Sequence, residues 1–226
     1  MTTSDVRQQL AADVELVAAA TDRLSASISE LNDGDIAGPS LLPGWSIGHC
    51  LTHVARNADG IGNLVTWALT DQWTPMYPSM AARDADIDAG SSRPAVEHRD
   101  DIASSAARLD EYLRRLLAAP DEALERLVIF GAPPPTTPPN TPAADLGFAR
   151  LREVSIHHAD LGLADFGYAN FDGPFVARTL AFIEARSGAA EVNGPPADVL
   201  TWRLGRGTPQ SLTDEHGNPP GPPPAW

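Results

Sequence analysis

Apolar residues recur at helical spacing along four long stretches of this chain, and this periodicity limits the folds that it can adopt. From about Asp5 to Leu31, valine, leucine and isoleucine return every three or four residues among polar ones, which is the pattern of an amphipathic helix. The same reasoning predicts long helices over residues 46–69, 95–119 and 141–163. Four such helices favour a mainly α-helical fold, a four-helix bundle, and the interior of such bundles commonly holds metal sites.

Capping residues indicate where two of these helices begin. Ser46 is a suitable N-cap for the second helix, and Thr141 followed by Pro142 is a strong start signal for the fourth. Between the second and third helices, residues 70–93 contain prolines and an acidic, Ser/Gly-rich run, which predicts an irregular loop. Loops of this length inside a domain are often functional.

The last quarter of the chain differs in composition from the rest. Shorter helices are expected near residues 174–186 and 197–204, and the tail that follows is rich in proline and glycine, with Trp226 as its expected anchor. We therefore expect a bundle domain over residues 1–166 and a short C-terminal appendage, partly helical and partly extended, over residues 167–226.

Charge and cysteine content exclude several classes of function. The formal net charge is -14, which disfavours binding to nucleic acid or to an anionic membrane, because both need basic residues on the protein. No apolar run approaches membrane-spanning length. Cys50 is the only cysteine, so an intrachain disulfide is impossible, and the first residues show no basic and then apolar leader. We expect a monomeric protein of the cytoplasm that binds neither nucleic acid nor membrane.

Glu153 and His157 form the most informative pair of side chains, because they stand four residues apart in a predicted helix and so leave the same face. A carboxylate and an imidazole that point at one place, with a third ligand from another helix, can hold a divalent metal and leave one coordination position open. His53 lies among apolar residues in the second predicted helix, which places it toward the bundle interior. We therefore favour these three residues as metal ligands over the alternative that His53 is a core histidine.

Three further polar residues have more than one interpretation. His49 lies one turn before His53, where it can supply an alternative ligand, line a cofactor site or cap the helix. Asn57 lies one turn after His53, where it can hydrogen-bond to a substrate or within the site. Arg206 stands between two glycines and can bind a carboxylate, but the residues alone favour a surface arginine in a turn.

Other residues close to the proposed ligands in the sequence receive simpler assignments. His158 leaves the helix about 100° from His157, so we do not expect it to be a ligand. Asp160 is either the acceptor that orients a ligating histidine or a charge that is solvated or paired with an arginine. Cys50 is expected to be a small buried apolar residue rather than a nucleophile.

Five short motifs occur in order along the chain: Ser-Leu-Leu-Pro-Gly-Trp at 40–45, His-Val-Ala-Arg-Asn-Ala at 53–58, Thr-Pro-Met-Tyr at 74–77, Arg-Glu-Val-Ser-Ile-His at 152–157 and Gly-Arg-Gly at 205–207. Together they resemble the mycothiol-dependent maleylpyruvate isomerase family, which belongs to a DinB-like superfamily of metal-binding four-helix bundles. The resemblance covers residues 1–187 with few gaps and resumes near residue 197, and between these points the chain is much shorter than the family pattern.

The resemblance implies a ligand set and a cofactor. His53, Glu153 and His157 match zinc ligands, although these donors also suit other divalent metals. Arg206 matches an arginine that is important for activity. The co-substrate would be mycothiol, a low-molecular-weight thiol of actinobacteria. The shortened segment changes one wall of the expected pocket, so the substrate carries over less directly than the metal.

The expected function is cis-trans isomerisation of a small electrophile of the maleylpyruvate type, through reversible addition of a thiolate. One alternative is a mycothiol S-transferase, which releases the thiol adduct instead of collapsing it. A second is a non-catalytic binding protein that a metal stabilises. Metal-assisted hydrolysis ranks below these, because Glu153, occupied as a ligand, leaves no obvious general base.

Overall fold

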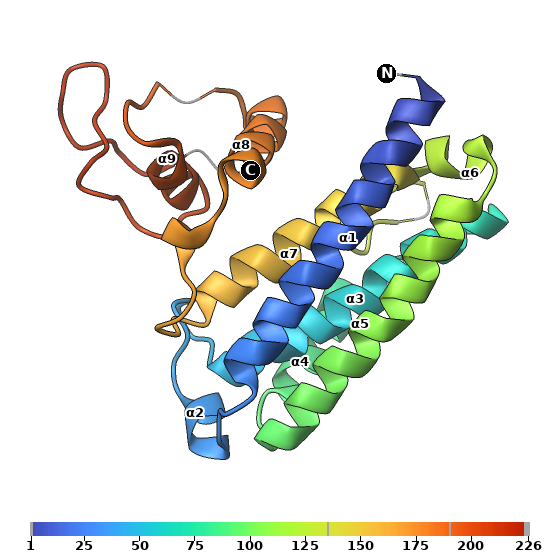
Figure 1. Ribbon diagram of the computed structural model, residues 1–226, viewed down its shortest axis with the longest axis horizontal. Helices are drawn as coiled ribbons and strands as arrows, with labels where there is room; N and C mark the ends of the chain where they lie inside the picture. Colours follow the sequence, from blue (N-terminus) through green and yellow to red (C-terminus); the bar gives the residue numbers. More distant parts are fainter. Residues whose placement is uncertain (1, 135, 190, 224–226) are drawn as a thin grey trace. The chain divides into compact units, whose positions relative to one another are not determined.

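Four long helices build the part of the chain that ends at Leu161, the first of the two units into which the computed structural model divides. The structure describes residues 2–134, 136–189 and 191–223. Helices α1 and α3 each pack against both α5 and α7, which closes a bundle (Figure 1). The predicted mainly α-helical bundle is therefore confirmed. The four helices are α1 (Thr3–Ile28), α3 (Ile47–Thr70), α5 (Ala95–Ala118) and α7 (Leu146–Asp160).

Side-chain caps fix the starts of α1 and α3. The Thr2 hydroxyl accepts a hydrogen bond from the Asp5 amide at 3.2 Å, and the Asp5 carboxylate accepts one from the Thr2 amide at 2.8 Å. Ser46 does the same for α3, because its hydroxyl accepts from the His49 amide at 3.2 Å. Each cap satisfies amide groups that the first turn of a helix leaves without a partner. The start predicted at Ser46 is confirmed.

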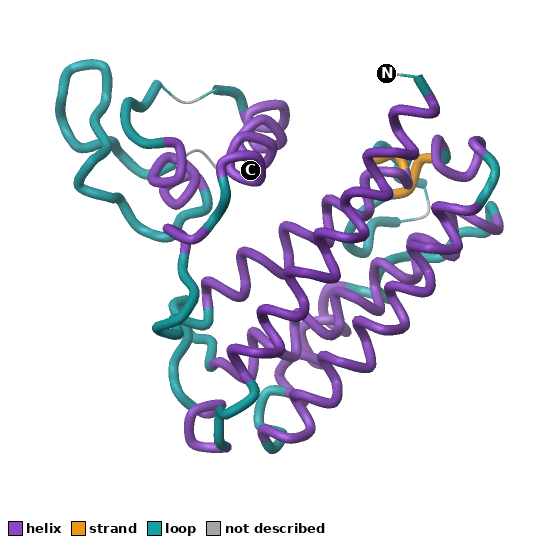
Figure 2. The backbone as a smooth tube through the Cα atoms, viewed as in Figure 1, coloured by secondary structure: helices purple, strands orange, loops and turns teal. Residues whose placement is uncertain are grey.

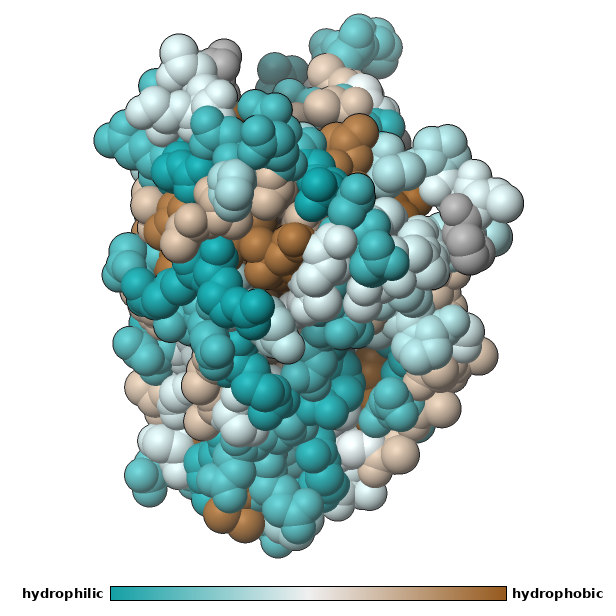
Figure 3. Space-filling view, turned by 90° about the vertical axis from the view of Figure 1, so that its right-hand side faces the viewer, coloured by the Kyte–Doolittle hydropathy of each residue, from teal (hydrophilic) through white to brown (hydrophobic). Residues whose placement is uncertain are grey.

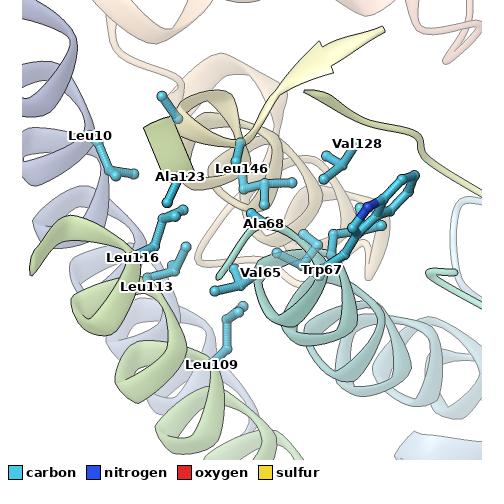
Figure 4. Packing of buried hydrophobic residues seen from close by; sticks show 14 of the residues in the cluster. Leu10, Val65, Trp67, Ala68, Leu109, Leu113, Leu116, Ala123, Val128 and Leu146 are labelled. Atoms are coloured by element: carbon cyan, nitrogen blue, oxygen red, sulfur yellow. The ribbon is translucent and has the colours of Figure 1, made fainter. Parts of the chain in front are cut away.

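One end of the bundle holds a continuous apolar core. Leucines of α1, α5 and α7 meet valine, alanine and tryptophan side chains of α3 there, and Figure 4 shows these side chains pointing toward one another. Leu113 and Leu116 of α5 are fully buried in this cluster. The labelled members are Leu10, Val65, Trp67, Ala68, Leu109, Leu113, Leu116, Ala123, Val128 and Leu146.

Three short helices connect the long ones, and one of them corrects a prediction. These are α2 (Asp33–Ala37), α4 (Met80–Gly90) and α6 (Asp121–Glu125). The irregular loop predicted over residues 70–93 is wrong, because α4 occupies its second half, packed on α3. Helix α4 buries Ile87 as its one large apolar side chain, so it carries no apolar periodicity. At Gly48 of α3 a Cβ would lie 2.0 Å from the Ser91 carbonyl oxygen, so only glycine permits this close approach after α4.

A two-stranded ribbon precedes α7 and corrects its predicted start. Strands β1 (Leu127–Val128) and β2 (Thr141–Pro142) pair in antiparallel register, Leu127 opposite Pro142 and Val128 opposite Thr141 (Figure 2). Thr141 is therefore not a helix N-cap. The amides of Asn140 and Ala143 donate to carbonyls of the β1 segment, which holds the chain extended until the 3-10 turn η1 (Ala143–Asp145) leads into α7.

The second unit begins at Gly162 and contains two helices and an ordered tail. After the 3-10 turn η2 (Tyr168–Asn170), α8 (Gly173–Ser187) packs against α9 (Pro196–Arg203). The indole N–H of Trp202 donates to the Gly221 carbonyl at 2.8 Å, which fastens the Pro/Gly-rich tail. Trp226, the expected anchor of this tail, lies outside the described residues.

The visible surface is mainly hydrophilic. Hydrophilic residues cover most of the face shown in Figure 3, and the hydrophobic patches between them are small and separate. Within the part of the chain that the structure describes, no helix combines the length and the hydropathy needed to cross a membrane.

Candidate metal centre

Two helices bring together the three side chains that the sequence singled out. Nε2 of His53 on α3 lies 3.1 Å from Oε2 of Glu153 on α7, and Nε2 of His157 lies 3.8 Å from the same oxygen. The two imidazole rings meet edge to face, with 4.6 Å between their centroids. One possible ligand atom from each residue falls within 4.8 Å of the others. Two imidazoles and a carboxylate at this separation suit a divalent metal such as zinc.

The local structure explains why these atoms converge. His157 follows Glu153 by four positions on α7, about one helical turn, so both side chains leave the face that packs against α3. His53 lies on the second turn of α3, whose start is fixed by the Ser46 cap. The side chain of His53 is 7% exposed and that of Glu153 is 34% exposed, so solvent reaches the cluster from the carboxylate. A bound ion would keep a position open to an incoming ligand there.

Burial and charge set the protonation states of the two central groups. Burial lowers the pKa of His53 to about 4, although the hydrogen bond to Glu153 opposes the shift. Burial alone would raise the pKa of Glu153, but the hydrogen bond from His53 and nearby positive charges, including Arg150, outweigh it and lower the pKa to about 2. At neutral pH the cluster therefore presents a neutral His53 imidazole and an ionised carboxylate, the forms that bind metals.

A buried carboxylate stands behind His157. Oδ2 of Asp160 lies 2.9 Å from Nδ1 of His157, an ion-pair distance, although the ring N–H is not aligned for a hydrogen bond. Asp160 is fully buried, and its carbonyl accepts a hydrogen bond from the Leu41 amide at 2.8 Å. Its burial excludes a solvated charge, and its position beside Nδ1 of His157 agrees with the interpretation in which it orients a histidine whose Nε2 faces the site.

Two arginines adjoin the cluster, and the sequence analysis identified neither. Arg83 of α4 places Nη2 3.1 Å from Nδ1 of His53. Arg150 is fully buried one turn before Glu153, and its Nη1 donates to the Val54 carbonyl. Burial lowers the pKa of Arg150 to about 10, so it stays cationic at neutral pH. The spacing of Arg150 from Glu153 could have revealed it, but Arg83 lay in a segment predicted to be irregular.

The other candidate residues of the first unit take supporting positions. Asn57 accepts a hydrogen bond from Arg150 at 2.8 Å, so it acts within the protein framework. Nδ1 of His49 lies 2.7 Å from the Ser46 hydroxyl, at the start of α3, and its ring stacks on Trp45 with centroids 6.1 Å apart. His158 lies 2.8 Å from the Ser27 hydroxyl, and Cys50 is buried.

Arg206 belongs to the second unit. It follows α9 between Gly205 and Gly207, which both adopt positive φ, at 72° and 102°. Its Nη1 donates to the Leu204 carbonyl at 2.8 Å, and its amide donates to the Thr201 carbonyl at 3.0 Å. The glycines thus turn the backbone after α9, and two backbone contacts hold the arginine at this turn.

Comparison with known proteins gives consistent matches. The family model of the mycothiol maleylpyruvate isomerase N-terminal domain matches residues 17–162. The crystal structures of the mycothiol-dependent maleylpyruvate isomerase and of a histidine-to-alanine mutant of it each match over the full length of both chains, with a TM-score of 0.83 and 26% identity. Uncharacterized proteins from two strains of Mycobacterium tuberculosis are each 25% identical over 203 residues, which cover 81% of this chain and 74% of each relative.

Proposed function

Because the chain belongs to the family of the mycothiol maleylpyruvate isomerase N-terminal domain, we propose that it is a metal-dependent enzyme that uses a low-molecular-weight thiol to isomerise a cis double bond. The proposed thiol is mycothiol and the proposed substrate is maleylpyruvate or a closely related electrophile, as in the solved structures that the chain resembles. We also propose that it acts as a monomer in the cytoplasm.

The convergence of three ligand atoms from α3 and α7 is the observation that carries this proposal. His53, Glu153 and His157 would hold the metal, and zinc suits this set of donors. A bound zinc ion would supply Lewis-acid chemistry that lowers the pKa of a thiol into the physiological range. Asp160 would keep the His157 ring in place, and the exposed edge of Glu153 marks the side from which a thiol and a substrate can enter.

The proposed reaction converts only the substrate, because the thiol that adds to it is released again. A thiolate forms a carbon–sulfur bond to one carbon of the cis double bond, and the π electrons move to the adjacent carbonyl group as an enolate. Rotation then occurs about the former double bond, which is now a single carbon–carbon bond. The enolate next re-forms the double bond and expels the thiolate, which leaves the trans isomer. Arg206 is proposed to bind a carboxylate of the substrate and to stabilise the developing negative charge.

Thiol transfer is the alternative outcome of the same chemistry. If the adduct is released before the enolate collapses, the enzyme conjugates the thiol to its electrophile. This alternative rests on the short segment over residues 187–196 that the sequence resemblance suggested, whereas the solved isomerase structures match over the full length of both chains, which favours isomerisation.

Metal analysis combined with product analysis tests the proposal. The protein, after incubation with zinc and dialysis, should retain about one ion per chain. It should convert maleylpyruvate to fumarylpyruvate only when mycothiol is present. His53→Ala and Glu153→Ala should lose both properties and retain the helical circular dichroism spectrum. Accumulation of a thiol conjugate would favour the transferase, and absence of both products would leave the binding protein.

The chain offers a matched control for this experiment. His216 is an exposed histidine of the second unit, with a side chain that is 73% exposed. His216→Ala removes an imidazole that is exposed to solvent and is not one of the proposed ligands, so it should retain zinc and activity. Equal loss of zinc in His216→Ala and His53→Ala would show that the metal binds nonspecifically, and the proposal would fail.

A further inference from the structure

Helix α4 brings a cation against the proposed metal ligand His53. Ser79 caps α4, since its hydroxyl accepts from the Ala82 amide at 3.0 Å, and Arg83 follows in the first turn. The guanidinium of Arg83 contacts Nδ1 of His53 through Nη2 at 3.1 Å, and its Cζ lies 5.9 Å from the centre of the Tyr77 ring. The side chain is 18% exposed, so a ligand from solvent can reach it.

The contact with Arg83 is incompatible with ligation of a metal by Nε2 of His53. A guanidinium only donates hydrogen bonds, so Nδ1 must accept and the ring proton must lie on Nε2, where Glu153 accepts it at 3.1 Å. Ligation through Nε2 requires the proton on Nδ1 instead, and there it would face the N–H groups of Arg83. The Nδ1–H group of His53 and the guanidinium of Arg83 are both donors, so they cannot hydrogen-bond to each other. Once the three ligands hold an ion, the guanidinium must therefore bind another acceptor.

Besides His53, Arg83 contacts the Tyr77 side chain and Asp84, and neither contact is a buried ion pair. Its Nη1 pairs with Asp84 at 2.6 Å, but the Asp84 side chain is 60% exposed, and exposed ion pairs hold weakly. Arg150, by contrast, is fully buried and uses Nη1 for the Val54 carbonyl and for Asn57, so it cannot reach out to a ligand. Arg83 is therefore the better placed of these two cations to bind an incoming anion beside the cluster.

We propose that Arg83 is a substrate-recognition residue, whose guanidinium leaves His53 when the metal site is filled and binds a carboxylate of the electrophile. This inference rests on the proposed function and adds a preference to it: the substrate should carry a carboxylate near its reacting double bond. A guanidinium binds a carboxylate with two parallel hydrogen bonds, which gives both affinity and orientation.

Binding of an unreactive dicarboxylate tests the inference without requiring turnover. Succinate lacks a double bond, so its affinity for the zinc-loaded protein can be measured by calorimetry. Arg83→Met should weaken succinate binding by about 10- to 100-fold, because it removes a charge-assisted bidentate contact, and Arg83→Lys should retain part of the affinity. The zinc content of each sample should equal that of the unaltered protein. Arg114→Gln removes an exposed arginine of α5 and should change nothing.

A second readout uses the metal-free protein. The ¹⁵N chemical shifts of the His53 ring should show the proton on Nε2 in the unaltered chain and on Nδ1 after zinc is added. Arg83→Met should reduce the preference for Nε2, because Nδ1 loses its donor. Equal succinate affinity in Arg83→Met and the unaltered protein overturns the inference alone. Absence of zinc binding and of thiol-dependent turnover in the unaltered protein overturns the proposed function instead.

Discussion

The two ends of the contact between α3 and α7 differ in the polar side chains that they bury. At one end, residues 58–68 of α3 and Leu146 of α7 join the apolar cluster of Figure 4. At the other end, the same two helices bury His53, Asn57, Arg150 and Asp160. Apolar contacts stabilise the fold without needing particular partners, whereas buried polar groups are costly unless each one is paired.

This difference indicates that the apolar end mainly stabilises the fold and that the polar end serves the candidate site. At the polar end, Arg150 donates to Asn57 and His53 shares a hydrogen bond with Glu153, whereas Nδ1 of His157 has no aligned hydrogen bond. Such a network can cost as much free energy as it returns, so packing does not explain its presence. We infer that burial of side chains at the apolar end offsets the free-energy cost of burying polar groups at the other end. The predictions below separate the two ends, from the largest expected effect to the smallest.

Leu113→Ala should cause the largest loss of stability. Leu113 is fully buried in the apolar cluster, so the truncation leaves a cavity and should lower the free energy of unfolding by about 2–5 kcal/mol. The zinc affinity of the folded fraction should not change. Urea unfolding and zinc titration measure the two quantities. Leu16 of α1 is 46% exposed, and Leu16→Ala should have almost no effect on either. A large drop in zinc affinity in Leu113→Ala would break the proposed separation.

Acid should weaken the metal-free protein through the polar end. The pKa of His53 is about 4 in the folded protein, below its ordinary value of 6.5, so the unfolded chain binds a proton first as the pH falls. The free energy of unfolding should therefore fall between pH 6.5 and pH 4, with up to about 3 kcal/mol from this group. The pKa of Glu153 is also lowered, from 4.5 to about 2, so this group extends the fall in the free energy of unfolding from pH 4.5 toward pH 2.

Urea unfolding at several pH values measures this slope. His53→Ala should flatten it between pH 6.5 and pH 4, without removing it, because burial also lowers the pKa of His98. His216→Ala should leave the slope unchanged. If His53→Ala and the unaltered protein lose stability in parallel, the acid sensitivity lies elsewhere in the molecule.

Asp160→Asn should affect metal binding more than folding. The substitution keeps the size of the side chain but removes the negative charge beside Nδ1 of His157. Loss of such a partner behind a ligating histidine typically reduces metal affinity by about 10- to 100-fold. Competition with a chromogenic zinc chelator measures the change. An unaltered zinc affinity would assign Asp160 to structure alone.

Ser46→Ala should have the smallest effect and should touch stability only. It removes the N-cap of α3 and should lower the free energy of unfolding by about 1 kcal/mol. His53, the proposed ligand on α3, lies about two turns after Ser46. Loss of the cap should loosen only the first turn of the helix, so the zinc affinity should stay within about twofold of that of the unaltered protein. Thermal unfolding and zinc titration together decide the outcome. A tenfold loss of zinc affinity would show that the cap also positions His53.

The sequence predicted what periodicity and spacing encode. The long helices followed from their apolar stripes, and the four-residue interval between Glu153 and His157 predicted that both would face one point. Helix α4 could not be predicted in this way, because Ile87 is its one large buried apolar residue. Arg83 was missed for the same reason, since its position beside His53 depends on how α4 packs.

Two other features depended on contacts that the sequence pattern does not show. Thr141 and Pro142 read as a helix start, but pairing with β1 gives their backbone an alternative that local propensity does not reveal. The partner of Asp160 became evident only when the ring of His157 was placed. Local patterns therefore identify the groups at the candidate centre, and tertiary packing decides which neighbours tune them.

The amide of Leu41, bonded to the Asp160 carbonyl, has a consequence for how this site can evolve. The bond joins the loop before α3 to the last turn of α7 through main-chain atoms, so any residue other than proline at position 41 can form it. Mutation can therefore exchange the proposed ligand side chains while the loop before α3 stays bonded to the last turn of α7. Descendants of this scaffold could therefore carry a different set of polar groups at the candidate centre on the same backbone frame.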